Sequence, residues 1–192
     1  ARIEGTSLLV PRWATWNFLT WENYTVKVDY KKEGAGSSFF SLRYNEKPQF
    51  RHGYWLEDTG TQLILYRQDK HPFVGDGTKF RKFLTSKIRA STSGWNMLSM
   101  SVDSTTVAGN PAAQIVVSLN NQLIISYTDS LTSTYTGDSV QYGPVAFGGI
   151  SFGTDGSGSK LSLDNLNVIG RVSGSQTWHQ TKGPEGGLAA DI

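Results

Sequence analysis

The side chains in this sequence best suited to ligand chemistry are an arginine, an acid and two aromatic residues in its first half. Arg43, Trp55, Glu57 and Tyr66 lie in stretches where apolar and polar residues alternate. An arginine and a carboxylate can orient vicinal hydroxyl groups through paired hydrogen bonds, and an aromatic ring can stack on the apolar face of a pyranose. We therefore predict that these four residues form the centre of a site for a polysaccharide or glycan.

Tyr54 and Arg67 are alternative members of this site. Tyr54 precedes Trp55 and Arg67 follows Tyr66. A shift of one residue in strand register exchanges the two faces of a sheet, so either neighbour could take the place of the predicted residue. The competing interpretation is a solvated sheet face in which Arg43 and Glu57 form an ordinary cross-strand pair.

Catalysis on a glycan is a second hypothesis. A glycosidase needs two carboxylates at a suitable separation, and the adjacent Glu57 and Asp58 of a strand point to opposite faces. A polysaccharide lyase needs a basic tyrosine or histidine and a group that neutralises a uronate. Residues of the right types are His52, Tyr54, Arg67, Gln68 and His71.

The elements that must position these residues are short strands. Apolar residues two positions apart recur along most of the chain, as in Tyr24, Val26, Val28 and Tyr30, and no segment has a convincing helical pattern. We predict an all-β fold, an antiparallel β-sandwich. The expected strands are 6–10, 23–32, 38–45, 53–58, 62–68, 80–90, 95–103, 113–119, 122–128, 145–153 and 159–169.

Two connecting segments are expected to have their own roles. The aromatic-rich stretch 13–21 is predicted to cap one end of the core, and 129–144 is predicted to be a long surface loop. Residues 1–170 are expected to form one domain. The polar, glycine-rich segment 171–192 is expected to be a tail or docking arm through which the protein could self-associate, so a structural surface, capsid or filament subunit is a third hypothesis.

Composition narrows the function classes. The chain has 192 residues, 38% of them apolar, no cysteine and a formal net charge of +2. The scattered basic residues argue against nucleic acid as a partner, and the absence of a long apolar run argues against a membrane span. The first residues lack the pattern of a signal peptide. The basic residues between Lys79 and Arg89 alternate with apolar ones, which predicts a charge-protected edge strand.

Three groups of segments resemble the laminin-G or concanavalin-A-like jelly-roll superfamily. The resemblance implies a carbohydrate-binding module outside the cell or on its surface. It also implies a structural calcium ion that ties the first strand to the last, with Glu4 and Asp164 as candidate ligands. The catalytic motifs of the superfamily's glucanases and alginate lyases are missing. The segments that carry the resemblance are 21–28, then 41–44, 53–57 and 63–67, and finally 95–98, 120–121, 148–152 and 163–166.

Overall fold

The structure is a computed structural model. It describes backbone and side chains for residues 21–44, 52–69, 80–89, 94–135, 140–155 and 159–170. For residues 2–4, 7–10, 13–16, 45–47, 50–51, 180–182 and 188–190 it describes the backbone of strands alone. The described part of the chain contains no helix that could cross a membrane.

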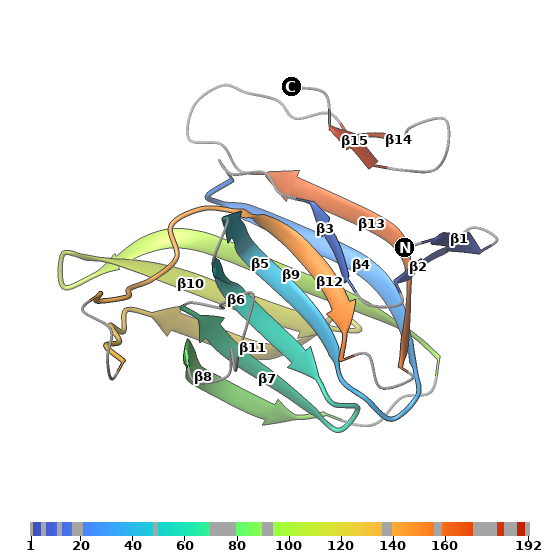
Figure 1. Ribbon diagram of the computed structural model, residues 1–192, viewed down its shortest axis with the longest axis horizontal. Coiled ribbons are helices and arrows are strands. Elements are labelled where there is room, and N and C mark those ends of the chain that lie inside the picture. Colours follow the sequence, from blue (N-terminus) through green and yellow to red (C-terminus); the bar gives the residue numbers. More distant parts are fainter. Residues whose placement is uncertain are drawn as a thin grey trace.

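The chain folds into two facing antiparallel sheets (Figure 1). The seven-stranded sheet has the order β1-β2-β13-β4-β9-β10-β11, and the six-stranded sheet has the order β3-β12-β5-β6-β7-β8. This confirms the predicted all-β antiparallel sandwich. The strands are β1 (Arg2–Glu4), β2 (Ser7–Val10), β3 (Trp13–Trp16), β4 (Tyr24–Glu33), β5 (Ser38–Lys47), β6 (Phe50–Asp58), β7 (Gln62–Gln68), β8 (Arg81–Ile88), β9 (Trp95–Val107), β10 (Asn110–Leu119), β11 (Gln122–Asp129), β12 (Gly149–Thr154), β13 (Lys160–Gly170), β14 (Gln180–Lys182) and β15 (Leu188–Ala190).

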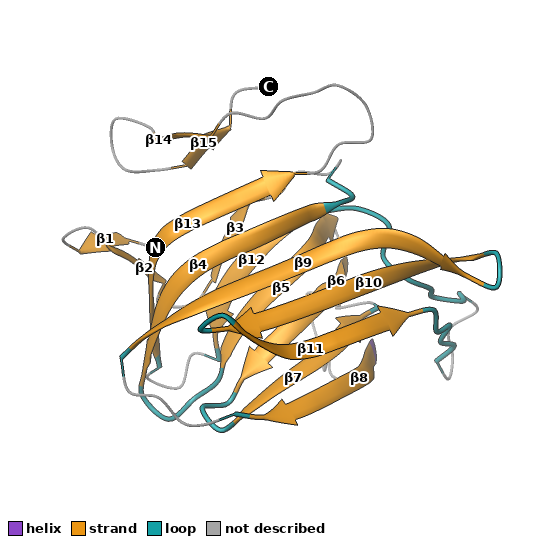
Figure 2. Cartoon of the chain, turned by 180° about the vertical axis from the view of Figure 1, so that it is seen from behind, coloured by secondary structure: helices purple, strands orange, loops and turns teal. Residues whose placement is uncertain are grey.

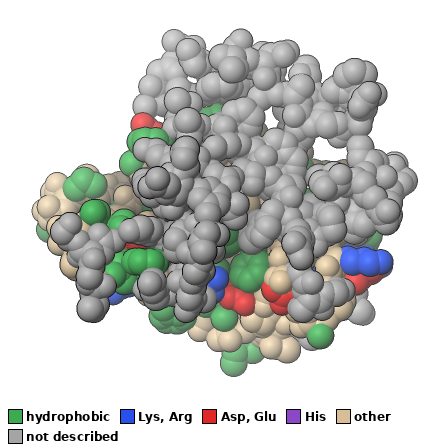
Figure 3. Space-filling view, viewed as in Figure 1, with side chains coloured by type: hydrophobic (Ala, Val, Ile, Leu, Met, Phe, Trp, Pro, Cys, Tyr) green, Lys and Arg blue, Asp and Glu red, His purple; other side chains and the backbone are tan. Residues whose placement is uncertain are grey.

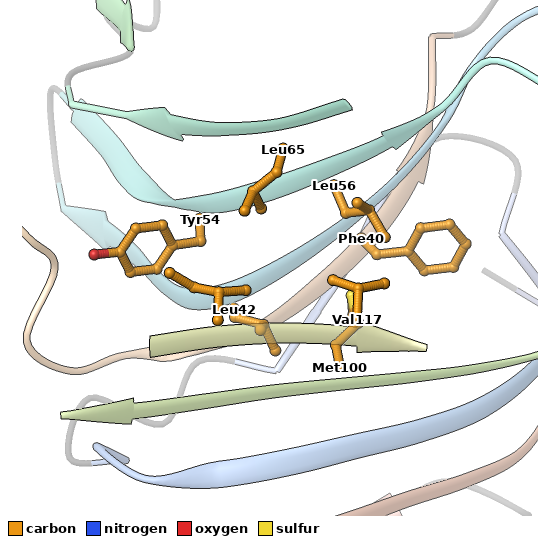
Figure 4. A pocket seen from close by; sticks show the side chains of 8 residues that line it. Phe40, Leu42, Tyr54, Leu56, Leu65, Met100 and Val117 are labelled. Carbon is orange, nitrogen blue, oxygen red and sulfur yellow. The ribbon is translucent and has the colours of Figure 1, made fainter. Parts of the chain in front are cut away.

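The core lies between the two sheets and follows the period of two seen in the sequence. In β4, Tyr24, Val26, Val28 and Tyr30 are buried, and the residues between them are more exposed. Figure 4 shows side chains of β5, β6 and β7 meeting those of β9 and β10 across the core. The space that they enclose has no room for a water molecule. Close packing therefore holds the sheets together here.

Three buried tyrosines add hydrogen bonds between the sheets. Tyr24 donates to the Gly149 carbonyl at 2.8 Å, Tyr30 donates to Asp58 Oδ2 at 2.7 Å, and Tyr54 donates to Asp129 Oδ2 at 3.0 Å. Burial raises the pKa of each of these hydroxyl groups above its ordinary value. Each tyrosine therefore fixes how one sheet sits on the other.

The segments predicted least well lie near the chain ends. Residues 13–16 form β3, which pairs with β12, so the prediction that 13–21 is only a cap was wrong. Aromatic residues also suit strands, and four residues are too few to show a clear alternation. β14 and β15 form a separate two-stranded sheet within the predicted tail 171–192. The side chains of that segment lie outside the described residues, so its role in self-association stays a prediction.

The basic strand is at the edge of its sheet, as predicted. β8 pairs with β7 alone and ends the six-stranded sheet, and β11 ends the other sheet on the same side (Figure 2). Phe83 and Ile88 of β8 are 61% and 86% exposed, beside the charged side chains of Arg81, Lys82 and Lys87. Charges on an edge strand disfavour pairing with another molecule.

Candidate functional site

Three of the predicted ligand residues share one face. Trp55 lies opposite Tyr66 and Glu57 lies opposite Ile64, all on the side of the six-stranded sheet that faces away from the core. We call this side the outer face. The rings of Trp55 and Tyr66 stack with centroids 6.2 Å apart and planes 18° apart. The alternation in β6 and β7 is therefore the predicted one, with Tyr54 and Arg67 on the core side.

The outer face carries polar groups around the two rings. The Arg81 guanidinium lies 4.6 Å from the centroid of the Tyr66 ring, and Glu57 Oε1 accepts a hydrogen bond from Ser37 Oγ at 2.7 Å. Trp55 and Tyr66 are only 4% and 3% exposed, whereas Glu57 is half-buried. Most of the aromatic surface is therefore withdrawn from solvent. A ligand-binding role for Trp55, Glu57 and Tyr66 stays a prediction.

Arg43 was predicted to lie on the outer face, but its side chain lies inside the protein. The pairing of β5 with β6 is irregular between Leu42 and Asn45, and Arg43 has a φ of 49°. This bulge turns the side chain into the protein, where it is 1% exposed. Its guanidinium donates to the carbonyl oxygens of Glu22 at 2.9 Å and Val145 at 2.5 Å, and burial lowers its pKa. The competing interpretation, in which Arg43 and Glu57 form a cross-strand pair, is therefore wrong.

Gly148 makes this bulge possible. Its φ is 150°, and a Cβ atom at this position would lie 2.4 Å from the backbone carbon and oxygen of Arg43. We expect Gly148→Ala to lower the free energy of unfolding by about 2–4 kcal/mol in urea denaturation, because backbone atoms would have to move. Gly109, with a φ of 80° and open space around it, is the matched control. Gly109→Ala should cost about 1 kcal/mol, and equal losses in the two variants would contradict the steric explanation.

Arg67 is enclosed at one end of the sandwich. All five of its N–H groups donate to protein acceptors: Asp69 twice, Asp129 Oδ2 at 2.7 Å, the Leu131 carbonyl at 2.8 Å and Ser133 Oγ at 3.1 Å. Burial acts to lower the pKa of Arg67, but hydrogen bonds with Asp69 and the charge of Asp129 raise it overall. Arg67 therefore has no donor left for a ligand.

These buried residues hold one loop in place. The described residues 130–135 and 140–148 lie between β11 and β12 at the end of the sandwich, and we call them the end loop; they run at the left in Figure 1 and at the right in Figure 2. Val145 of the end loop donates its N–H to Tyr54 Oη at 3.0 Å and accepts from Arg43. Ser133 and Tyr142 exchange two backbone hydrogen bonds of 2.8 and 2.9 Å. Arg43, Tyr54 and Arg67 are therefore positioning residues.

A cleft of about 270 Å³ lies between the end loop and the start of β6. Its aromatic members are Tyr142, whose ring packs 5.8 Å from that of Tyr135, and Phe147, which is 43% exposed. Asp69 supplies a carboxylate that is held by Arg67 and by Tyr135 Oη at 2.6 Å. The residues that line the cleft are His52, Asp69, Gln141, Tyr142, Gly143, Pro144, Val145, Ala146 and Phe147.

Most of the residues that line this cleft were not predicted from the sequence. Only His52, a candidate base for the lyase hypothesis, was singled out, and Asp69, Gln141, Tyr142 and Phe147 were not. Gln141 and its neighbours lie in or directly after a segment without apolar periodicity, so no local pattern marks them. The aromatic content of the loop was the one available signal. Gln68 faces the other way and accepts a hydrogen bond from Arg81 on the outer face, and His71 lies outside the described residues.

Two of the predicted catalytic arrangements, a glycosidase pair of carboxylates and Tyr54 as a base, are not supported at the cleft. Asp69 is the sole carboxylate among the described residues that line it, and glycosidase chemistry uses two. Tyr54, the predicted lyase base, is buried; its hydroxyl donates to Asp129, and burial raises its pKa. A base requires a lowered tyrosine pKa, so this environment disfavours the role.

The predicted calcium site is represented by one described side chain. Asp164 lies opposite Asp29 and accepts a hydrogen bond from the Asn165 N–H at 2.8 Å, and the side chain of Glu4 lies outside the described residues. Within the described ranges, no group of three histidine or acidic residues could hold a metal ion. Calcium takes six to eight oxygen ligands, which two carboxylates do not supply. Calcium binding therefore stays a prediction.

Similarity to known proteins is found among solved structures. No family model matches the chain, and no curated protein sequence matches it. Among solved structures, the carbohydrate-binding module CBM66 from Bacillus subtilis matches with a TM-score of 0.44 at 9% identity over 77% of this chain and 74% of the module. Sheep galectin-11 matches with a TM-score of 0.46 at 12% identity over 83% of this chain and 99% of the galectin.

A putative glycosyl hydrolase from Parabacteroides distasonis matches with a TM-score of 0.48 at 12% identity, covering 86% of this chain and 87% of that protein. At these sequence identities and TM-scores, the matches show a similar path of the chain and nothing about function. The class of this protein is defined by its own two sheets, and its function must be argued from its own side chains.

Proposed function

We propose that this protein binds carbohydrate without catalysis, in the cleft beneath the end loop, and that it does so outside the cell or on its surface. The observation that supports this most is an exposed aromatic ring, Phe147, in one cleft with the fixed carboxylate of Asp69. A ring can stack on the apolar face of a sugar, and a carboxylate can accept from its hydroxyl groups. Gln141 and His52 offer further hydrogen-bonding groups in the same cleft.

The size and preorganisation of the cleft agree with this function. Its volume of about 270 Å³ is near the lower end of the range for small-ligand sites. Its wall is preformed, because Arg43 and Tyr54 hold Val145 from the buried side. A preformed site loses less entropy when a ligand binds than a site that has to be ordered.

The test is affinity electrophoresis through gels that contain single polysaccharides, with Phe147→Ala as the test variant. We expect this variant to bind at least about tenfold more weakly than the parent, because it loses the stacking surface. Phe83→Ala is the matched control, since Phe83 is an exposed phenylalanine that does not line the cleft. Retardation by no polysaccharide, or the same change in both variants, would show that the proposal is wrong.

The outer face is the second location for the same function. It is favoured by the buried hydroxyl of Tyr66, which has no hydrogen-bond partner among the described residues. Glu57→Ala separates the two locations, because Glu57 is half-buried on the outer face and does not line the cleft. Binding that is lost in Glu57→Ala and retained in Phe147→Ala would move the site to the outer face.

A further inference from the structure

The carboxylate in the cleft has a fixed position. Asp69 is 3% exposed, and its two oxygens accept hydrogen bonds from Arg67 and from Tyr135 Oη. Because three donors hold the carboxylate, it has little freedom to turn away from a ligand that enters the cleft. Each oxygen keeps acceptor capacity, since an ionised carboxylate offers about four lone-pair positions.

The charges around this carboxylate do not cancel. Arg67 contacts two carboxylates, Asp69 and Asp129, and the side chains of all three residues are at most 1% exposed. One guanidinium therefore faces two acids, which leaves one excess negative charge. Buried charges are screened by salt far less than charges in solvent.

Among the described residues, few cationic groups lie on the ligand side of the cleft. The described lining residues include neither lysine nor arginine, and His52 is the one that can become cationic. The nearby guanidinium of Arg43 lies behind the end loop, where its N–H groups donate to Val145, Glu22 and Ser104. An acidic group on a ligand would therefore find no lysine or arginine among the described residues that line the cleft.

We propose that the cleft selects uncharged saccharides and rejects those that carry uronate or sulfate groups. This selectivity rests on the proposed carbohydrate-binding function. Hydroxyl groups of a neutral sugar donate to Asp69, and the aromatic side chains contact the ring faces. An anionic group in the same place is repelled by a carboxylate whose own counter-ion is already shared.

A glycan array with neutral polysaccharides and acidic derivatives of the same backbones tests this selectivity. The array is read at about pH 8, where a histidine of ordinary pKa is neutral. We expect the bound glycans to be neutral, and each acidic derivative to bind at least about tenfold more weakly than its neutral parent. Equal or tighter binding of the acidic derivatives would overturn the selectivity and leave the binding function intact. Binding of no glycan at all would overturn the binding function itself.

Two variants identify the source of the selectivity. Asp69→Asn removes the charge in the cleft, so we expect it to weaken binding of the neutral glycan and to narrow the difference between neutral and acidic forms. Glu33→Gln removes one charge from β4 of the other sheet and should change neither. Thermal denaturation reports whether Asp69→Asn is folded; if it is not, the comparison of glycans on the parent protein still decides the outcome. A similar narrowing in Glu33→Gln would mean that net charge sets the preference.

Discussion

Replacing Arg67 with methionine will lower the free energy of unfolding by about 3–5 kcal/mol, because it leaves two buried carboxylates without their cation. Arg67 forms buried ion pairs with Asp69 and with Asp129, and Asp129 also accepts the hydrogen bond of Tyr54. Methionine retains part of the volume and none of the five donors. Urea denaturation followed by tryptophan fluorescence measures the loss.

Arg81→Met is the control for Arg67→Met. Arg81 lies on the neighbouring strand, is partly exposed and contacts the Tyr66 ring and Gln68, so its loss should cost about 1 kcal/mol. The double variant Arg67→Met with Asp129→Asn should regain part of the lost stability, because one uncompensated charge is removed. Equal losses in Arg67→Met and Arg81→Met would show that the buried network contributes little.

The Arg67 variants also show whether Arg67 affects binding by holding the end loop in position or by contacting the ligand. The donors of Arg67 are engaged by the protein, and two of its acceptors, the Leu131 carbonyl and Ser133 Oγ, belong to the end loop. We expect Arg67→Lys to keep the charge, lose part of the hydrogen bonding, and be less destabilised than Arg67→Met. If binding falls in step with stability across these variants, Arg67 acts through the loop that it holds.

Alkaline pH will unfold the protein over a narrow interval that begins near the ordinary tyrosine pKa of about 10. Burial raises the pKa of Tyr24, Tyr30, Tyr54 and Tyr66 above that value. Above pH 10, the tyrosines of the unfolded chain release protons that the same tyrosines keep in the folded protein. The free energy of unfolding is therefore unaffected by these groups below about pH 10, and it falls as the pH rises above that value. Each group contributes about 1.4 kcal/mol per pH unit, so the four together give about 5.5 kcal/mol per pH unit.

Urea denaturation at a series of alkaline pH values, with tyrosinate absorbance as a second signal, measures this slope. Tyr66→Phe is an informative variant, because the Tyr66 hydroxyl is buried and has no partner among the described residues. The variant should reduce the slope by about a quarter and leave stability at neutral pH unchanged or higher. Gradual tyrosine ionisation without unfolding would contradict the assignment of these hydroxyl groups to the core.

Alternation along single strands was predictable from the sequence because side-chain direction in a strand depends on the strand alone. It placed Tyr24, Val26, Val28 and Tyr30 in the core, and Trp55, Glu57 and Tyr66 together on the other side of their sheet. The same pattern, with its turn residues, predicted two facing antiparallel sheets.

The sequence thus determined the fold class, the positions of most strands along the chain and the faces of the regular strands. The tertiary structure alone decided the bulge that buries Arg43, the ion pairs of Arg67 and the cleft beneath the end loop. The physical reason is distance along the chain. Arg67 and its partner Asp129 are separated by 62 residues of sequence, and Tyr24 and its partner Gly149 by 125. Such contacts form only when two sheets are stacked, and they leave no period in the sequence.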